Sequence, residues 1–280
     1  MTPRTRRTPT SAARLALVAG AVGVAALVPP ALRSLRGRPA FDRTSAAAGV
    51  SAQFDQDAAS YDRLVGANPG YHEHLRLSAR RLGLAADGAG AVLLDVGCGT
   101  GLSTAALVET YPAARVVAVD ASAEMLAEAR EKSWPEGVRF VHARAEDLGP
   151  ALAAAGIEGS FDGVLAAYLV RNLPDRDAGL AVLVDHLAPG APIAVHEYSV
   201  ADSALARAIW TAVCWVIIIP MGRRVTGDAS LYRYLWRSVL AFDGLTRLEQ
   251  RLRDAGLREV HTRPVDGWQR GIVHTVLGRR

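Results

Sequence analysis

The fold of this 280-residue chain is decided by one stretch, Leu93-Leu-Asp95-Val-Gly97-Cys-Gly99-Thr-Gly101. The apolar residues over 91–96 predict a short buried strand, and a helix is expected to follow at 102–109. Glycine is needed between them because the turn uses backbone angles closed to other residues and because a ligand must approach a backbone that carries no Cβ. The stretch therefore predicts a strand–loop–helix unit that holds a ligand.

The spacing of these glycines indicates the kind of ligand. The pattern is Gly-x-Gly-x-Gly, whereas a dinucleotide-binding loop carries Gly-x-Gly-x-x-Gly and aims a helix N-terminus at a pyrophosphate. Asp95 comes just before Gly97, Gly99 and Gly101, and a carboxylate there would attract a cationic amino acid group and repel phosphate. We therefore predict that these four residues bind such a ligand, with a plain tight turn as the alternative.

Strands and helices alternate on both sides of this unit, as a parallel sheet requires. Strands are expected over 91–96, 115–119, 138–142, 161–167, 192–197, 257–262 and 272–277. Helices are expected over 72–84, 102–109, 123–132, 176–187 and 245–255, with Ser122 as an N-cap. The sequence predicts an α/β, Rossmann-like fold with a seven-stranded, mostly parallel sheet and helices on both faces. Apolar helices over 204–219 and 230–240 form an insertion that would cap the substrate.

Two further strand ends carry candidate ligand contacts. Asp120 ends the second strand, where an acid can accept hydrogen bonds from both hydroxyls of a ribose; the alternative is an N-cap for the next helix. Ala121 follows it. The third strand leads to 142–147, where such folds commonly hold an adenine edge, so Ala145 and Glu146 are candidate contacts as well.

The chain resembles the ubiquinone/menaquinone C-methyltransferase family, within the class I methyltransferases that use S-adenosylmethionine (SAM). Besides the glycine loop, the resemblance is carried by Phe54-Asp…Tyr61-Asp62, Val170-Arg-Asn-Leu-Pro-Asp175 and Tyr232-Arg-Tyr-Leu235. It extends from about residue 54 to 277. The Arg-Asn and Tyr-x-Tyr-Leu elements narrow it to this family, whereas the glycine loop alone is typical of methyltransferases in general. The chain departs from the family pattern at Leu169, usually glycine, and at Arg144, usually Asp or Asn.

The resemblance implies SAM as cofactor and C-methylation of a demethylated prenyl quinol. A ring carbon becomes nucleophilic when the hydroxyl beside it ionises, and Arg171 would stabilise that phenolate. Asn172 would orient a water or the substrate oxygen, and Tyr61 would close over the site. His196, at the end of the fifth strand, would act as the base.

Other interpretations remain for these residues and for the function. For Arg171 the alternative is a salt bridge to Asp175 or Asp162, and for His196 it is a structural role. The alternative function is methylation of a soluble aromatic or secondary metabolite. A third interpretation is a membrane-tethered SAM-binding protein without catalysis.

Composition limits the partners. The net charge is +4 and the arginines are spread along the chain instead of forming a stripe, so no nucleic-acid partner is expected. No disulfide is expected between Cys98 and Cys214, and no histidine or cysteine spacing indicates a metal site.

Two apolar stretches point to a membrane. Residues 1–38 form a basic and apolar segment ahead of a methyltransferase domain at 39–280; its apolar run, 15–28, is shorter than the roughly 20 residues of a spanning helix. A membrane anchor or interfacial helix is expected there, with a signal peptide, an over-long start or a soluble helix as alternatives. The stretch 209–220 is predicted to be a lid or tunnel for a prenyl tail, with core packing or a homodimer contact as the alternative. We expect a cytoplasmic enzyme peripheral to, or anchored in, the membrane.

Overall fold

A computed structural model describes Asp62 and residues 70–280. The segment 1–38 and Tyr61 lie outside the described residues, so the interpretations that concern them stay predictions. The strands are β1 Val92–Val96, β2 Arg115–Asp120, β3 Val138–His142, β4 Gly163–Ala167, β5 Pro192–Tyr198, β6 Arg258–Pro264 and β7 Val273–Arg279. Helices against the sheet are α3 Tyr71–Arg80, α4 Leu102–Thr110, α5 Ala123–Arg130, α6 Leu148–Ala154, α7 Arg176–Asp185 and α11 Leu245–Asp254.

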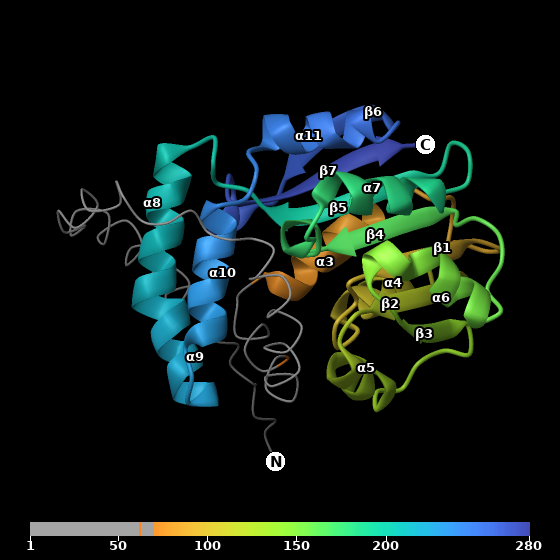
Figure 1. The fold of residues 1–280 in the computed structure, drawn as a ribbon, viewed down its shortest axis with the longest axis horizontal. Coiled ribbons are helices and arrows are strands. Elements are labelled where there is room, and N and C mark those ends of the chain that lie inside the picture. Colours follow the sequence, from red (N-terminus) through yellow and green to blue (C-terminus); the bar gives the residue numbers. More distant parts are fainter. Residues whose placement is uncertain (1–61, 63–69) are drawn as a thin grey trace, which may run out of the picture.

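The strands form one seven-stranded sheet in the order β3-β2-β1-β4-β5-β7-β6 (Figure 1). β1 pairs in parallel with both β2 and β4, and β7 runs antiparallel to β5 and β6. The predicted mostly parallel sheet is confirmed. Strand order reverses between β1 and β4, which is where ligands bind in open sheets of this kind.

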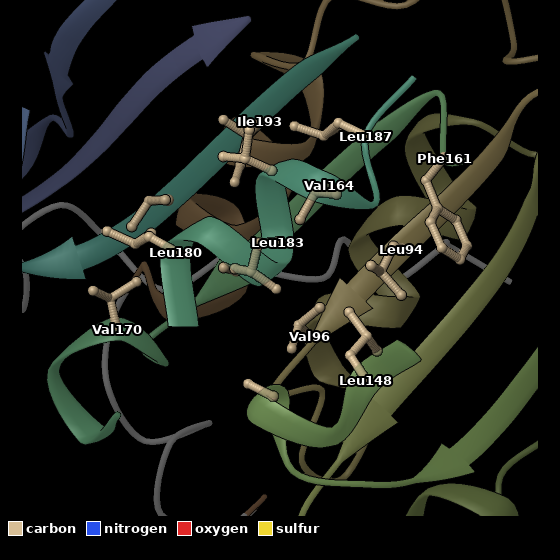
Figure 2. Close-up of a cluster of buried hydrophobic side chains, with 14 of the residues drawn as sticks. Leu94, Val96, Leu148, Phe161, Val164, Val170, Leu180, Leu183, Leu187 and Ile193 are labelled. Atoms are coloured by element: carbon tan, nitrogen blue, oxygen red, sulfur yellow. The ribbon is translucent and has the colours of Figure 1, made fainter. Parts of the chain in front are cut away.

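Helices cover both faces of the sheet, as expected from the alternating pattern. α3, α4 and α5 cover one face, and α6, α7 and α11 cover the other. On the second face Leu94 and Val164 of the sheet pack against Leu148 of α6 and Leu180 and Leu183 of α7, all fully buried or nearly so (Figure 2). Apolar area removed from water here is the main stabilisation of the domain.

α6 is a helix that the sequence reading did not expect. Its first turn contains Gly149 and Pro150, which normally argue against a helix. Proline is tolerated there because the first-turn N–H groups have no intrahelical partner anyway. Leu148 and Leu152 are buried against the sheet, so tertiary packing outweighs the weak local propensity.

The insertion forms two long helices that stand beside the sheet (Figure 1). The first is continuous over α8 Ala204–Val213, a π-helical turn Cys214–Ile218 and α9 Ile219–Thr226; α10 Ser230–Leu240 returns along it. This helix extends beyond the expected end near 219. Pro220 does not end it, because the proline falls in the first turn of α9, directly after the π turn. We call residues 204–240 the helical arm.

Trp210 and Trp236 join the two helices of the arm. Both side chains are buried, and they belong to one apolar cluster with Tyr198 at the end of β5. The arm is therefore attached to the carboxyl end of the sheet, where a helical substrate cap was expected.

Gly222→Ala tests the contact between α9 and α10. A Cβ at Gly222 would lie 2.2 Å from the Tyr232 ring, so α9 and α10 must separate to accept it. We expect the free energy of unfolding to fall by about 1–3 kcal/mol in chemical denaturation. Gly149→Ala is the matched control, because a Cβ there meets nothing closer than 3.6 Å. It should leave stability unchanged or raise it by up to about 1 kcal/mol; equal effects would contradict the close approach at Gly222.

Candidate functional site

A cavity lies at the carboxyl ends of the strands, between the glycine loop and the loop after β4. Most of the predicted site residues line it: Gly97, Gly99, Asp120, Ala121, Ala145, Glu146, Arg171 and Asn172. Asp95, Gly101 and His196 do not line it. The residues come from the ends of four strands, β1 to β4, and from the loops after them, which the parallel sheet brings to one edge.

The glycine loop has the backbone geometry for which glycine was predicted. Gly97, Gly99 and Gly101 all have positive φ, at 76°, 55° and 88°. A Cβ at Gly101 would lie 2.7 Å from the Trp134 ring, whereas a Cβ at Gly99 would meet no atom within 4 Å. Gly101 is thus required by packing, and Gly99 leaves its backbone open for a ligand.

Asp95 lies beneath the loop and not in the cavity wall. Its carboxylate is fully buried, and Oδ2 accepts hydrogen bonds from the hydroxyls of Ser103 (2.8 Å) and Thr104 (2.7 Å) at the start of α4. Oδ1 has no partner among the described residues. Burial raises the pKa of Asp95 to about 7. The expected direct contact with a ligand is therefore replaced by support of the loop from below.

Asp120 holds the other side of the loop. One carboxylate oxygen accepts the Gly99 N–H at 2.7 Å, and the other accepts the Ser122 N–H at 2.9 Å. The Ser122 hydroxyl itself caps α5 by accepting the Met125 N–H, as predicted. Each carboxylate oxygen has a second lone pair, so Asp120 can still accept hydrogen bonds from a ribose.

A clamp on the glycine loop was not foreseen. Lys132, the single lysine of the chain, donates to Asp62 Oδ2 at 2.5 Å and to the Thr100 carbonyl at 2.6 Å. The Thr100 hydroxyl donates to the other oxygen of Asp62. Asp62 had been noted as part of the opening motif, but nothing in the sequence connects it to a lysine seventy positions away.

Arg171 forms a buried ion pair with Glu197. Its Nη1 lies 2.6 Å from Glu197 Oε1, and the two side chains are only 5% and 1% exposed. Burial alone would lower the pKa of Arg171, but the Glu197 carboxylate outweighs it and the pKa is raised. The same Nη1 donates to the Tyr168 carbonyl at 3.0 Å. The salt-bridge alternative is thus correct in kind, although the partner is neither Asp175 nor Asp162.

Asn172 connects the Arg-Asn motif to the helical arm. Its Nδ2 donates to the Tyr168 carbonyl at 3.1 Å, and its Oδ1 accepts the hydroxyl of Tyr234 from α10 at 3.0 Å. The two motifs that narrowed the resemblance therefore meet at the cavity, although 62 positions separate them.

His196 lies behind the cavity wall. Its ring is completely buried, Nδ1 lies 2.8 Å from Ser78 Oγ, and Nε2 lies 3.1 Å from Tyr168 Oη. Burial lowers the pKa of His196 to about 3. The imidazole does not line the cavity. His196 therefore does not have the geometry expected of a base that contacts the substrate.

Tyr71 and Tyr168 line the cavity and were missed from the sequence. Their rings stack with centroids 5.5 Å apart, and the Tyr198 ring lies tilted against the Tyr168 ring with the centroids 4.9 Å apart. The available signal was position: Tyr168 directly follows β4, and the carboxyl ends of parallel strands meet at the ligand site.

The residues present fit SAM. The open backbone at Gly99, the Asp120 carboxylate at the end of β2 and the loop containing Ala145 and Glu146 form one continuous wall. Leu169 packs on Gly97, where a Cβ would lie 3.1 Å from its side chain. Within Asp62 and residues 70–280, no three His, Cys, Asp or Glu side chains gather as metal ligands.

Comparison with known proteins gives relatives over most of the chain. A family model described as the ubiE/COQ5 methyltransferase family matches residues 44–278. Demethylmenaquinone methyltransferase of Clavibacter sepedonicus is 33% identical over 76% of this chain and 84% of its own length. The ubiquinone/menaquinone biosynthesis C-methyltransferase UbiE of Bradyrhizobium diazoefficiens is 32% identical over 67% of this chain and 73% of its own length.

Solved structures share the fold. A SAM-dependent methyltransferase from Aquifex aeolicus superposes with a TM-score of 0.53 at 17% identity, over 80% of this chain and 98% of that one. Phosphoethanolamine N-methyltransferase 2 of Haemonchus contortus, in complex with SAM, gives a TM-score of 0.53 at 19% identity, over 75% of this chain and 43% of that one.

Asp95→Asn tests the buried carboxyl through pH. Burial raises the pKa of Asp95 in the folded chain to about 7, whereas the ordinary pKa of an aspartate is 3.8. Between the two pKa values the folded chain holds a proton that the unfolded chain releases. The free energy of unfolding therefore falls as pH rises from about 4 to about 7 and levels off above, by at most about 4 kcal/mol.

Denaturation at a series of pH values should show the unsubstituted chain losing stability relative to Asp95→Asn across this interval. Exposed Asp147, substituted in the same way, is the control for the Asp-to-Asn change itself. A stability difference between the unsubstituted chain and Asp95→Asn that is constant with pH would contradict the raised pKa.

Proposed function

This chain belongs to the ubiE/COQ5 methyltransferase family and is a SAM-dependent methyltransferase, and we propose that its acceptor is a demethylated prenyl quinol of the menaquinone or ubiquinone type. The relatives named for demethylmenaquinone and for ubiquinone/menaquinone biosynthesis support this acceptor class. The observation that carries the proposal is the hydrogen bond between Asn172 and Tyr234. It joins the two motifs that separate this family from other methyltransferases, at the wall of the cavity.

The cofactor half of the site holds SAM through backbone and carboxylate groups. When bound, SAM supplies a methyl group on a positively charged sulfur. We assign Asp120 to the ribose hydroxyls, Ala121, Ala145 and Glu146 to the adenine side, and Gly97 and Gly99 to close backbone contact. Asp95 and Gly101 act beneath this surface by holding the loop. Catalysis then depends on aligning donor and acceptor for in-line displacement.

The acceptor half lies between Tyr71, Tyr168 and the Arg-Asn pair. The ring carbon beside an ionised hydroxyl would take the methyl group that SAM supplies, the sulfur would keep the electrons of the broken bond, and solvent water would take the ring proton so that aromaticity is restored. Because Glu197 already neutralises Arg171, we assign Arg171 and Asn172 to shaping this wall. Tyr61, through its place in the opening motif, is proposed to close over the acceptor.

A transfer assay tests the acceptor. Purified full-length protein is incubated with methyl-labelled SAM and demethylmenaquinol in detergent, and in parallel with a soluble naphthol. Label is expected in the quinol fraction. Label only in the soluble naphthol would favour the alternative metabolite, and SAM binding without transfer to either acceptor would favour the non-catalytic interpretation. Asp120→Ala is the control. It should abolish transfer to every acceptor, because every transfer needs SAM bound at the same site.

We also propose that the helical arm rests on an anionic lipid surface. The large apolar side chains that are exposed in the described residues all lie on its first helix: Leu205, Trp215, Val216, Ile217 and Val225. That helix, Ala204–Thr226, is also the one in the described part of the chain that is long and apolar enough to cross a membrane. Exposed apolar side chains along one helix favour its insertion into a lipid interface.

The positive charge of the arm favours anionic lipid. Residues 204–226 contain no acid, and Arg207, Arg223 and Arg224 are exposed on the same helix. α10 adds exposed Arg233 and Arg237. Exposed arginines beside apolar side chains that enter a lipid interface are attracted to anionic headgroups. A prenyl quinol dissolved in that lipid would then reach the cavity along the arm, on the cytoplasmic side where SAM is found.

Vesicle sedimentation tests this contact. We expect full-length protein to bind vesicles that contain phosphatidylglycerol more tightly than vesicles of phosphatidylcholine alone. Arg223→Glu with Arg224→Glu should weaken binding to the anionic vesicles by about 10- to 100-fold. Trp215→Ser with Ile217→Ser should weaken binding to both.

Arg247→Glu is the control, since Arg247 is exposed on α11 and its reversal changes a charge outside the arm. Residues 1–38 are present in every variant, so a difference between variants reports on the arm alone. Equal binding of all variants would contradict the proposal. A concentration-dependent dimer that Trp215→Ser abolishes would identify a second copy of the chain as the occupant instead.

A further inference from the structure

The glycine loop must be held in one conformation if it is to bind a ligand tightly. Gly97, Gly99 and Gly101 all adopt positive φ, and glycine loses more backbone entropy on ordering than any other residue. A ligand that bound a mobile loop would have to order it, and that cost would reduce the affinity. Contacts that order the loop in advance therefore raise the affinity for the cofactor.

The end of β2 holds the first half of the loop. The N–H groups of Gly97 and Cys98 donate to the Val119 carbonyl at 2.8 Å and 3.1 Å. The Gly99 N–H donates to the Asp120 carboxylate at 2.7 Å. These contacts extend as far as Gly99, and the next residue is held by a different part of the chain.

Lys132 holds the second half of the loop at Thr100. It lies just beyond α5, and its Nζ donates to the Thr100 carbonyl at 2.6 Å. The charge of the ammonium group makes this a strong hydrogen bond. Thr100 lines the cavity, whereas Lys132 does not. Lys132 therefore acts on the ligand site through the loop.

Asp62 keeps the ammonium group of Lys132 in this position. Its Oδ2 accepts from Lys132 Nζ at 2.5 Å, and its Oδ1 accepts the hydroxyl of Thr100. The Lys132 and Asp62 side chains are 33% and 38% exposed, so their ion pair alone contributes little to stability. The three residues form a closed set of hydrogen bonds, and this set fixes the Thr100 carbonyl.

Trp134 supports the loop from the same segment. Its Nε1 donates to the Ala129 carbonyl at 2.7 Å, and a Cβ on Gly101 would lie 2.7 Å from its ring. The Lys132 N–H donates to the same Ala129 carbonyl at 3.2 Å. Residues 132–134 are thus attached to the last turn of α5, so the support itself is held in place.

We propose that Lys132 is a positioning residue for SAM. Together with Asp62 it holds the Thr100 carbonyl, and the glycine loop then has its ligand-binding conformation before the cofactor arrives. The inference concerns the affinity for the cofactor and does not depend on which acceptor is methylated.

Calorimetric titration of the full-length protein with S-adenosylhomocysteine tests this role without methyl transfer. Lys132→Met keeps a long side chain and removes the charge and the N–H donors. The dissociation constant should rise about 10-fold, as expected for the loss of one charge-assisted hydrogen bond. The melting temperature should fall by about 4 °C at most, because the ion pair is partly exposed. A residue that supported only the fold would lower the melting temperature and leave the dissociation constant unchanged.

Two further variants show whether the charge acts through the loop. Lys132→Arg keeps a positive charge and N–H donors, so it should bind S-adenosylhomocysteine more tightly than Lys132→Met. Arg130→Met is the matched control, because Arg130 is exposed on the last turn of α5 and donates to the Phe140 carbonyl instead of the glycine loop. It removes one positive charge from the same end of α5 and should leave the dissociation constant unchanged.

Hydrogen exchange measures the order of the loop directly. In the ligand-free protein, Lys132→Met should speed amide exchange in peptides that contain residues 97–101, and Arg130→Met should not. A double-mutant cycle tests the part played by Asp62. Asp62→Asn should weaken binding by itself and add little to Lys132→Met, because Asp62 acts by holding the ammonium group.

Three results would overturn the inference. They are an unchanged dissociation constant in folded Lys132→Met, an equal loss of affinity in Arg130→Met, and effects of Asp62→Asn and Lys132→Met that add. If Lys132→Met fails to fold, Asp62→Asn decides, and unchanged binding in that variant contradicts the proposal. The transfer assay with demethylmenaquinol tests the proposed acceptor separately, because S-adenosylhomocysteine binding is measured without any acceptor.

Discussion

Parallel pairing of β1 with both β2 and β4 is the constraint on which the site depends. Parallel strands all end at the same edge, so the loops after β1, β2, β3, β4 and β5 converge although they are far apart in the chain. The sheet order reverses between β1 and β4, and helices leave to opposite faces there. The space left at that reversal is lined by the glycine loop on one side and by Tyr168 on the other.

Buried charges around this edge support the loops more than they contact ligands. Asp95 holds the start of α4 from beneath, and Asp120 holds the glycine loop through the Gly99 N–H. Glu197 pairs with Arg171 and so ties the loop after β4 to the end of β5. A buried ion pair contributes little net stability, but removal of one partner is costly. The Arg171–Glu197 pair therefore acts chiefly to give the loop after β4 one conformation.

The sequence predicted the elements well wherever periodicity was strong. All seven strands and the N-cap Ser122 are found, and Ser230–Leu240 is a helix as expected. α6 was not predicted, because Gly149 and Pro150 have low helix propensity. Burial of Leu148 and Leu152 stabilises the helix nonetheless. The end of the arm's first helix was also misplaced, since a π turn that local patterns do not predict carries the helix through Pro220.

For the site, the sequence by itself located the glycine loop and Asp120, because they stand at the ends of strands whose pattern is local, and it located the Arg-Asn pair through the family resemblance. It did not determine what these side chains contact. The partners of Arg171, Asn172 and His196 are Glu197, Tyr234 and Tyr168, which lie 26, 62 and 28 positions away. Only the tertiary structure decided them, because hydrogen bonding and burial depend on distances that packing creates. For that reason an expected base became a buried histidine behind a tyrosine.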